Sequence, residues 1–316
     1  MPGLFTAIGD LLDFLELESG SAPYPIFNRT TPLLVSRNFA ARMRKNDWYD
    51  PLLLQVLPRF EESIAREGFD EDPVRDRSAS VVQGVLQKYR GRALLLTCGK
   101  CSIHCRYCFR RSSNLSACEG PEAYEEAIGF IERNGSLAEV ILSGGDPLCL
   151  PPLQFKCLAG RLAAIAHVNT IRVHTRLPVA DPGKVADHLE TFEFLSKVKN
   201  CIVVIHANHV AELEDDCPAA LSDLRSTGAL LLNQSVLLRH INDRAEVLAD
   251  LSKALLDNGV MPYYLHQLDR VKGSWHFETS IARGRELMGE LRRMLPGYAL
   301  PRYVREIAGE QAKMPL

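Results

Sequence analysis

The chain has 316 residues, of which 46% are hydrophobic and 24% charged, a balance typical of a soluble globular protein with about two domains or one large α/β barrel. Its formal net charge of −2 argues against a general binder of nucleic acid or of acidic membranes, because both need a basic surface. No apolar run approaches the roughly 18 residues of a membrane helix, and the start has no basic segment, so the sequence predicts a cytoplasmic protein without a secretion signal.

Residues 1–90 are predicted to form a helical N-terminal section. Proline interrupts this section at several points, including Asp50-Pro51 and Asp72-Pro73. It contains no repeat and no motif with identifiable chemistry. We therefore expect it to pack on the part of the chain that follows.

Residues 91–300 are predicted to form a partial (β/α)6 barrel, followed by a C-terminal tail over 301–316. Strands that are apolar on both faces, each followed by a helix, indicate a parallel sheet covered by helices. The predicted strands are 92–97, 139–142, 170–174, 201–205, 229–232 and 261–265. The amphipathic segments of helical length between them are about 121–133, 151–166, 183–198, 211–227 and 243–258.

Polar residues follow all six predicted strands at the point where each strand ends. In barrels of this kind the reactive groups lie at the carboxyl ends of the strands, so this placement predicts an enzyme. The segments concerned are 101–108, 143–146, 174–176, 206–209, 233–235 and 266–269.

Three cysteines on one short segment have the spacing Cys-x3-Cys-x2-Cys: Cys101, Cys105 and Cys108. Three thiolates on one loop can bind three irons of a cubane cluster and leave the fourth iron open to a small molecule. If Cys98 is added, the four could instead form a zinc knuckle, or Cys98 could be a small buried residue. An odd total of nine cysteines indicates a metal site in a reducing compartment rather than a disulfide framework.

The triplet after the first predicted strand resembles the radical S-adenosylmethionine superfamily. This resemblance implies a [4Fe-4S] cluster held by the three cysteines, with S-adenosyl-L-methionine on the open iron. Gly144, Gly145 and Asp146 resemble the Gly-Gly-(Glu/Asp) motif of that superfamily, which contacts the amino group of the methionine moiety.

Within that superfamily, the chain resembles the lysine 2,3-aminomutases over about residues 35–316. The matching segments are 88–96, 172–178, 233–239, 262–266, 273–277 and 309–316. The resemblance implies pyridoxal 5'-phosphate bound as a Schiff base to Lys313, in a Gly-x-x-x-Lys-x-Pro context that begins at Gly309. A primary amine suits this role because it forms an imine with an aldehyde and exchanges it.

The same resemblance assigns further cofactor and substrate contacts. Tyr89 and Arg92 would lie on the phosphate side of pyridoxal phosphate, with Lys88 where fermentative members have arginine, and Gln234 would be a further cofactor-binding residue. Arg110 would pair with the substrate carboxylate, which a guanidinium fits with two hydrogen bonds. The side-chain ammonium of lysine needs carboxylates, and the matching positions are Asp269 and Glu306.

The function implied is an isomerase that moves the α-amino group of L-lysine to Cβ by a 5'-deoxyadenosyl radical mechanism. Because the chain stops soon after Lys313, it looks most like the branch that makes β-lysine for elongation factor P. The expected partners are a small amino-acid substrate and an electron donor protein, without nucleic acid or membrane, and an oligomer is compatible with the sequence. The alternatives are an aminomutase for another cationic amino acid, a radical enzyme without the pyridoxal step, and a zinc-stabilised binding module.

Overall fold

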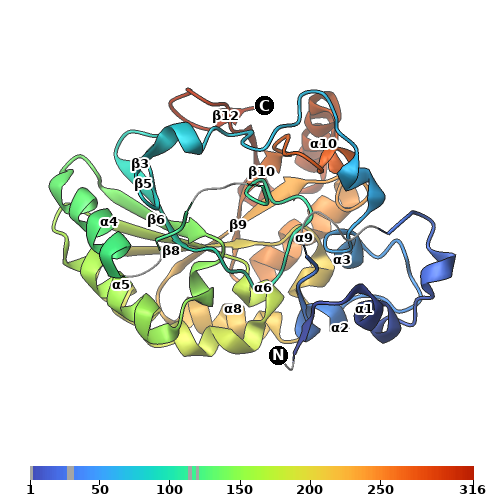
Figure 1. Ribbon diagram of the computed structural model, residues 1–316, viewed down its shortest axis with the longest axis horizontal. Coiled ribbons are helices and arrows are strands. Elements are labelled where there is room, and N and C mark those ends of the chain that lie inside the picture. The colour runs from blue at the N-terminus through green and yellow to red at the C-terminus, as the bar shows by residue number, and fades with distance from the viewer. Residues whose placement is uncertain (1–2, 27–31, 113–115, 119–120) are drawn as a thin grey trace.

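The computed structural model describes residues 3–26, 32–112, 116–118 and 121–316. These residues form a ten-stranded sheet and a separate two-stranded one (Figure 1). The strands of the large sheet are β3 (Ser80–Val82), β4 (Val85–Leu86), β5 (Arg92–Cys98), β6 (Glu139–Gly144), β7 (Thr170–Thr175), β8 (Asn200–His206), β9 (Leu230–Leu237), β10 (Met261–Gln267), β11 (Arg302–Arg305) and β12 (Met314–Pro315).

The six strands predicted from apolar runs are confirmed as β5 to β10. Neighbouring strands from β5 through β11 pair in parallel, and β4 and β12 add antiparallel pairs at the two sides. The order runs from β12 at one edge to β3 at the other, and no pairing joins these two edges in the described part of the chain. The sheet is therefore an open, partial barrel, as the fold class predicted.

The helices between the strands pack against the sheet, as predicted. They are α4 (Pro121–Arg133), α5 (Pro152–Ala164), α6 (Leu177–Ala180), α7 (Leu189–Val198), α8 (Cys217–Ser226), α9 (Ala245–Asp257) and α10 (Ile281–Met294). Two predicted helices are shorter than expected. The segment 183–198 begins as a 3-10 helix, Pro182–His188, and the segment 211–227 is interrupted at Asp215, whose φ is +54°, before Pro218 enters the first turn of α8.

The N-terminal section is less helical than predicted. Its helices are α1 (Ile8–Phe14), α2 (Arg37–Ala41) and α3 (Pro51–Leu54), beside the short hairpin β1 (Leu4–Phe5) and β2 (Val35–Ser36). Asp50 begins α3, because its carboxylate accepts from the backbone N–H groups of Leu52 and Leu53 at 2.9 Å each. α1, α2 and α3 lie at one side of the sheet (Figure 1), and the buried leucines of the section share one hydrophobic core with the strands.

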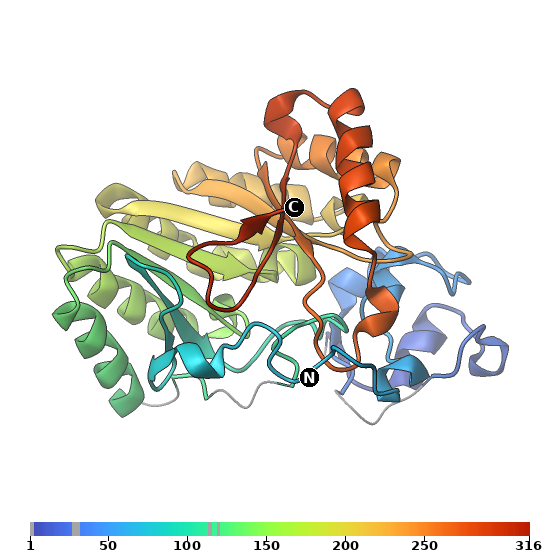
Figure 2. The ribbon, with the colours of Figure 1, turned by 90° about the horizontal axis from the view of Figure 1, so that it is seen from above.

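The C-terminal tail belongs to the sheet. β11 extends it in parallel beside β10, and β12 folds back on β11 as an antiparallel strand. Figure 2 shows the tail turning back over the sheet, with the C-terminus near the middle of the view. Glu306 follows β11, and Lys88 follows β4. The distance from Lys88 Nζ to Glu306 Oε1 is 2.8 Å, so an ion pair joins the two sides of the open sheet where no strands pair.

None of the helices described in the structure is long and apolar enough to span a membrane.

Candidate active site

The three motif cysteines lie together on the loop that follows β5. Cys101, Cys105 and Cys108 are each partly exposed, and all nine cysteines of the chain are free thiols. The N-terminal section holds this loop, because the backbone N–H of His104 donates to Leu34 and that of Arg106 donates to Gln55. The loop therefore stands at the carboxyl end of the sheet, where the sequence placed it.

Gly144 and Gly145 bring the end of β6 against the start of the cysteine loop. A Cβ on Gly145 would lie 2.2 Å from the carbonyl oxygen of Lys100, and one on Gly144, whose φ is +117°, would lie 2.8 Å from that of Cys98. The N–H of Gly145 donates to Cys98 over 2.7 Å. The close approach that needs these glycines is thus between two backbone segments.

Asp146 is buried and joins the ends of β6 and β7. Its carboxylate accepts from the backbone N–H of Leu148 at 3.0 Å, from Thr175 Oγ1 at 2.7 Å and from the backbone N–H of Arg176 at 2.7 Å. Burial raises the pKa of Asp146, against these hydrogen bonds, which lower it. Its predicted contact with the methionine moiety stays a prediction, since its carboxylate oxygens are already bonded within the protein.

The donor set fits a cluster with three protein ligands. Burial raises the pKa of the Cys101 and Cys108 thiols, so these thiols stay protonated until metal displaces the proton. Among the described residues, no three Cys, His, Asp or Glu side chains converge on one ion. A cubane needs no such centre, because each thiolate binds a different iron. Cys98 donates to the carbonyl of Asp146 over 3.1 Å, which suits a small buried residue.

The cysteine loop is one polar centre of the site, and the C-terminal lysine lies in a second one. Lys313 donates to Glu306 Oε2 at 2.6 Å, and its side chain is 24% exposed. Glu306 also accepts from Lys88 at 2.8 Å. Burial would raise the pKa of Glu306, yet the two lysines hold that pKa at about 2. Glu306 is therefore a carboxylate at neutral pH, fully engaged by two cations.

A continuous chain of ion pairs connects the two centres. Lys88 contacts Asp76 at 2.6 Å, and Asp76 accepts from Arg110 Nε at 2.9 Å. Arg110 follows Cys108 by two residues on the cysteine loop. From Lys313 through Glu306, Lys88 and Asp76 to Arg110, every step is a direct contact. The tail lysine and the cysteine loop therefore lie on the same side of the molecule.

Two histidines and a third carboxylate line the region around Lys313. Burial lowers the pKa of His174 and His266 well below the ordinary value, and the charge of Lys313 lowers both further, so both imidazoles are neutral. Asp269 differs from Glu306, because no described lysine or arginine lies within 4 Å of its carboxylate. Burial is the main cause that raises the pKa of Asp269 to about 7. The positive charge of Lys313 lowers this pKa, and the negative charge of Glu306 raises it.

Of the predicted phosphate-side residues, Tyr89 is partly buried, whereas Arg92 is exposed at the first position of β5 and pairs with Glu139 at 3.7 Å. The guanidinium of Arg92 is 5.7 Å from the ring centre of Tyr89. Burial raises the pKa of Tyr89, and the nearby Glu306 raises it further, which places this tyrosine beside the Lys313 centre. Gln234 lies level with His206 and Tyr264 in the registers of β8–β9 and β9–β10. The binding roles of these residues stay predictions.

Two of the polar residues predicted at the strand ends face away from the site. Asn233 and Ser235 contact the backbone of Ala207 and lie towards α9, whereas Gln234 between them faces the interior of the partial barrel. The reason is the alternation of side chains along a strand. Sequence reasoning also missed Asp76, because no motif around it in the N-terminal section indicated a role.

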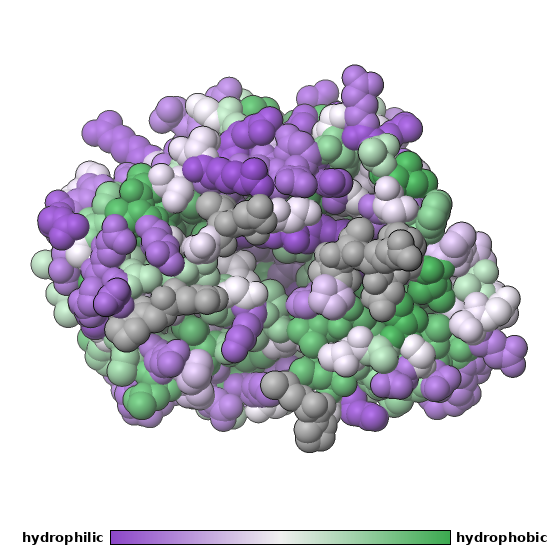
Figure 3. All heavy atoms as spheres, in the orientation of Figure 1, coloured by the Kyte–Doolittle hydropathy of each residue, from purple (hydrophilic) through white to green (hydrophobic). Residues whose placement is uncertain are grey.

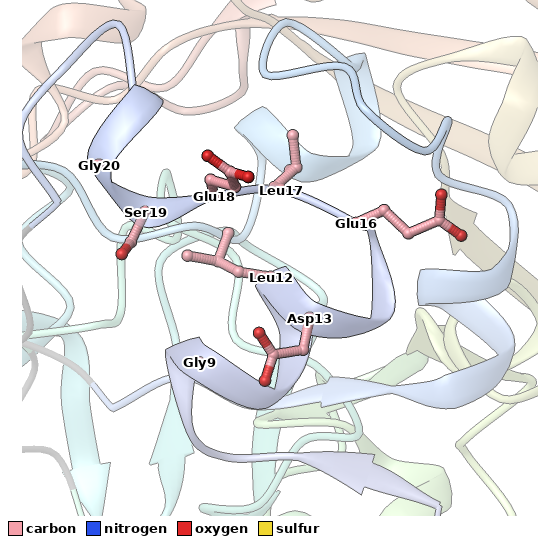
Figure 4. Close-up of a pocket in the computed structure, with 8 residues that line it drawn as sticks. All are labelled: Gly9, Leu12, Asp13, Glu16, Leu17, Glu18, Ser19 and Gly20. Carbon is pink, nitrogen blue, oxygen red and sulfur yellow. The ribbon is translucent and has the colours of Figure 1, made fainter.

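Figure 3 shows hydrophilic residues gathered over the upper part of one face, where Figure 1 places β12 and β3, above a hollow near the centre. A different hollow, with a volume of about 600 Å³, lies between α1 and the turn Ser19–Ser21 (Figure 4). Its carboxylates, Asp13, Glu16 and Glu18, point in different directions, and Glu16 pairs with Lys45. The active-site residues are therefore not those of this second hollow.

Comparison with known proteins finds relatives that cover most of the chain. It is 43% identical to the L-lysine 2,3-aminomutase of Escherichia coli over 285 residues, which are 90% of this chain and 83% of that protein. It is 39% identical to the L-lysine 2,3-aminomutase of Buchnera aphidicola over 308 residues, 96% of this chain and 90% of the relative. The protein of the same name from Haemophilus influenzae is 37% identical over 282 residues, 89% of this chain and 83% of the relative.

The chain belongs to the L-lysine 2,3-aminomutase family, and the resemblance seen in the sequence is confirmed. No family model matches the chain. Among solved structures, it is similar to a radical SAM methyltransferase from Sphaerobacter thermophilus, with a TM-score of 0.45 and 17% identity, covering 70% of this chain and 68% of the other.

Proposed function

We propose that this protein is an isomerase that converts L-lysine to β-lysine by moving the α-amino group to Cβ. We further propose that it uses a [4Fe-4S] cluster on Cys101, Cys105 and Cys108, S-adenosyl-L-methionine, and pyridoxal 5'-phosphate on Lys313. The observation that supports this best is the chain of ion pairs from Arg110 to Lys313, because it joins the segment that we propose to hold the cluster to the one that we propose to hold pyridoxal phosphate.

The residues of the chain bind and orient the reactants. When bound, the cluster and S-adenosyl-L-methionine supply the radical that takes hydrogen from Cβ, and pyridoxal phosphate supplies the aldehyde that carries the amino group. Arg110 uses Nε for Asp76 and Nη1 for Ser143, which leaves Nη2 to the substrate carboxylate. Asp269 is a partly buried carboxylate with no described lysine or arginine within 4 Å, which suits the substrate's ammonium.

Product analysis after anaerobic reconstitution with iron, sulfide and pyridoxal phosphate tests this function. With a chemical reductant and S-adenosyl-L-methionine, we expect lysine to give the β-isomer, detected by mass spectrometry after derivatisation. Ornithine and arginine serve as cationic comparisons, and glutamate as the anionic one. If ornithine or arginine were converted and lysine were not, the proposed substrate would be wrong. If none of these amino acids were converted, the proposed reaction would be wrong.

Metal analysis of the anaerobically purified protein separates this function from a zinc-stabilised binding module. Iron with equimolar sulfide agrees with the proposed cluster, whereas stoichiometric zinc would reject it. The pyridoxal step has a separate readout, because borohydride reduces a lysine–pyridoxal phosphate imine to a stable amine that mass spectrometry detects. A sample that holds the cluster but no pyridoxal phosphate would be a radical enzyme without this step.

Asp76→Asn should weaken lysine binding more than it slows turnover. Asp76 is 2% exposed and contacts both Arg110 and Lys88, so its removal frees the guanidinium that we assign to the substrate carboxylate. A hydrogen bond to a charged group contributes about 1.5 to 3 kcal/mol, so we expect KM for lysine to rise at least about tenfold with a smaller change in kcat.

Glu71→Gln is the matched control for Asp76→Asn. Glu71 lies in the same segment but is exposed and pairs with Arg77 and Lys272 on the surface. Steady-state kinetics with lysine should leave this control unchanged. If Asp76→Asn lowered kcat about tenfold and left KM for lysine unchanged, the positioning role of Asp76 would be contradicted.

Three further features of the implied function stay predictions. They are the delivery of β-lysine to the modification of elongation factor P, the electron donor protein, and the cytoplasmic location.

A further inference from the structure

A buried arginine lies beneath the cysteine loop and contacts one of its thiols. Arg176 follows β7 and is 7% exposed. Its Nη1 lies 2.6 Å from Cys105 Sγ, and its Nη2 donates to Glu212 and to Gln55 at 2.8 Å each. A guanidinium therefore bridges a proposed cluster ligand and a buried carboxylate.

Contacts on several sides hold this guanidinium in place. The backbone N–H of Arg176 donates to Asp146, which orients the chain at the end of β7. The guanidinium also lies against two aromatic rings, at 5.3 Å from the centre of Phe39 and 5.8 Å from that of Tyr107. Rotation away from Cys105 would break these contacts, so the position is predetermined by the fold.

The carboxylate on the other side is equally fixed. Glu212 is fully buried and accepts from Gln55 Nε2 at 2.9 Å and from the backbone N–H groups of Asn208 and His209 at 3.0 and 3.1 Å. These hydrogen bonds come from the N-terminal section and from the loop after β8. Glu212 thus partly offsets the positive charge of Arg176 at a fixed distance from the thiol.

We propose that Arg176 sets the reduction potential of the iron–sulfur cluster by donating to Cys105. The inference rests on the proposed cluster but not on the identity of the amino-acid substrate. Reduction transfers one electron from a low-potential donor to the cluster and makes it more negative by one charge. Hydrogen bonds to the sulfurs and local charge set such potentials, so a cation at Cys105 favours the reduced form and raises the potential.

Glu212 gives the same proposal a second, opposite consequence. Its negative charge counteracts that of Arg176, so neutralising Glu212 should raise the potential of the cluster, whereas neutralising both should lower it. The pairwise change Arg176→Met with Glu212→Gln avoids leaving one buried charge without its partner. The two variants therefore bracket the wild-type value from opposite sides.

A redox titration of the reconstituted protein tests this inference. The reduced cluster is followed by electron paramagnetic resonance as the solution potential is lowered with dithionite and mediators. At a fixed potential near the wild-type midpoint, we expect the ratio of reduced to oxidised cluster to fall about tenfold in the double variant, equal to 59 mV for one electron. In Glu212→Gln alone, the ratio of reduced to oxidised cluster should rise. In Arg176→Lys, which keeps the positive charge, this ratio should lie between those of the double variant and the wild type.

Arg172→Met is the matched control, because Arg172 lies on β7, four residues before Arg176, and pairs with Glu139 instead of a cysteine. Its cluster should keep the wild-type potential. Unchanged potentials in all variants, with normal iron and sulfide content, would overturn the role of Arg176 and leave the proposed function intact. A wild-type protein that assembles no cluster would overturn both. If the double variant assembles none, a lowered or unchanged potential in Glu212→Gln would overturn the inference, and a raised one would support it.

Discussion

Lys313→Ala should reduce the formation of β-lysine to below about one-thousandth of the wild-type rate, because a methyl side chain cannot condense with an aldehyde. Lys313→Arg should lose activity to a similar extent. The guanidinium can keep the ion pair that Lys313 forms with Glu306, but it does not form an imine. Agreement between the two variants would separate the amine chemistry of Lys313 from its charge.

The readouts for Lys313 must distinguish lost chemistry from lost structure. Both variants should retain the visible absorbance of the iron–sulfur cluster, since Lys313 lies on the tail and not on the cysteine loop. Covalently bound pyridoxal phosphate, trapped by borohydride, should be absent. Lys272→Ala, which removes an exposed lysine paired with Glu71, serves as a control and should keep full turnover. Normal turnover in Lys313→Ala would remove this lysine from the active site.

The central part of the fold could be predicted from hydrophobic pattern, because both faces of a parallel sheet are covered. A buried strand such as β8 is then apolar along most of its length and stands out in the sequence. The cysteine loop could be placed for the same reason, since it follows the end of β5. The limits were local: Asp215 and Pro218 interrupt a segment whose apolar pattern alone predicted one helix.

The contacts that assemble the active site could not be predicted in this way, because they join residues far apart in the chain. Asp76 meets Arg110 across 34 residues, and Lys88 meets Glu306 across 218. Nothing near Asp76 in the sequence marks it as different from a surface carboxylate. A single sequence also could not show that the backbone of Lys100 lies where a side chain at position 145 would be; the predicted ligand contact of Gly145 stays a prediction.

The carboxylates predicted for the substrate ammonium have different surroundings, which the sequence treats as equal. Glu306 is paired with Lys88 and Lys313, whereas Asp269 has no cation within 4 Å among the described residues. Loss of water around a carboxyl that has no close counter-ion makes it ionise with difficulty, and the pKa of Asp269 is accordingly raised to about 7. Lysine, whose side-chain ammonium remains charged at this pH, would supply the missing cation.

The pKa of Asp269 makes the use of lysine dependent on pH. Below about pH 7 the carboxyl carries a proton, which must leave before an ammonium can pair with it. The competent, ionised fraction rises from roughly one-tenth at pH 6 to roughly nine-tenths at pH 8, so kcat/KM for lysine should rise about tenfold over this range. The same raised pKa opposes folding as pH increases from about 4 to 7, because ionisation of Asp269 is easier in the unfolded chain.

Asp269→Asn should remove both effects. Loss of one partner of a buried ion pair costs about 3 to 4 kcal/mol, so kcat/KM for lysine at pH 8 should fall a few hundredfold and lose this pH dependence. The variant should be at least as stable as the wild type at pH 8, measured by urea unfolding, since a neutral amide needs no counter-ion. Asp257→Asn, at the exposed end of α9, is the matched control. If Asp269→Asn kept the wild-type kcat/KM and pH profile, the ammonium of lysine would have to bind elsewhere, and the pairing of Glu306 with two lysines would then be the first contact to reconsider.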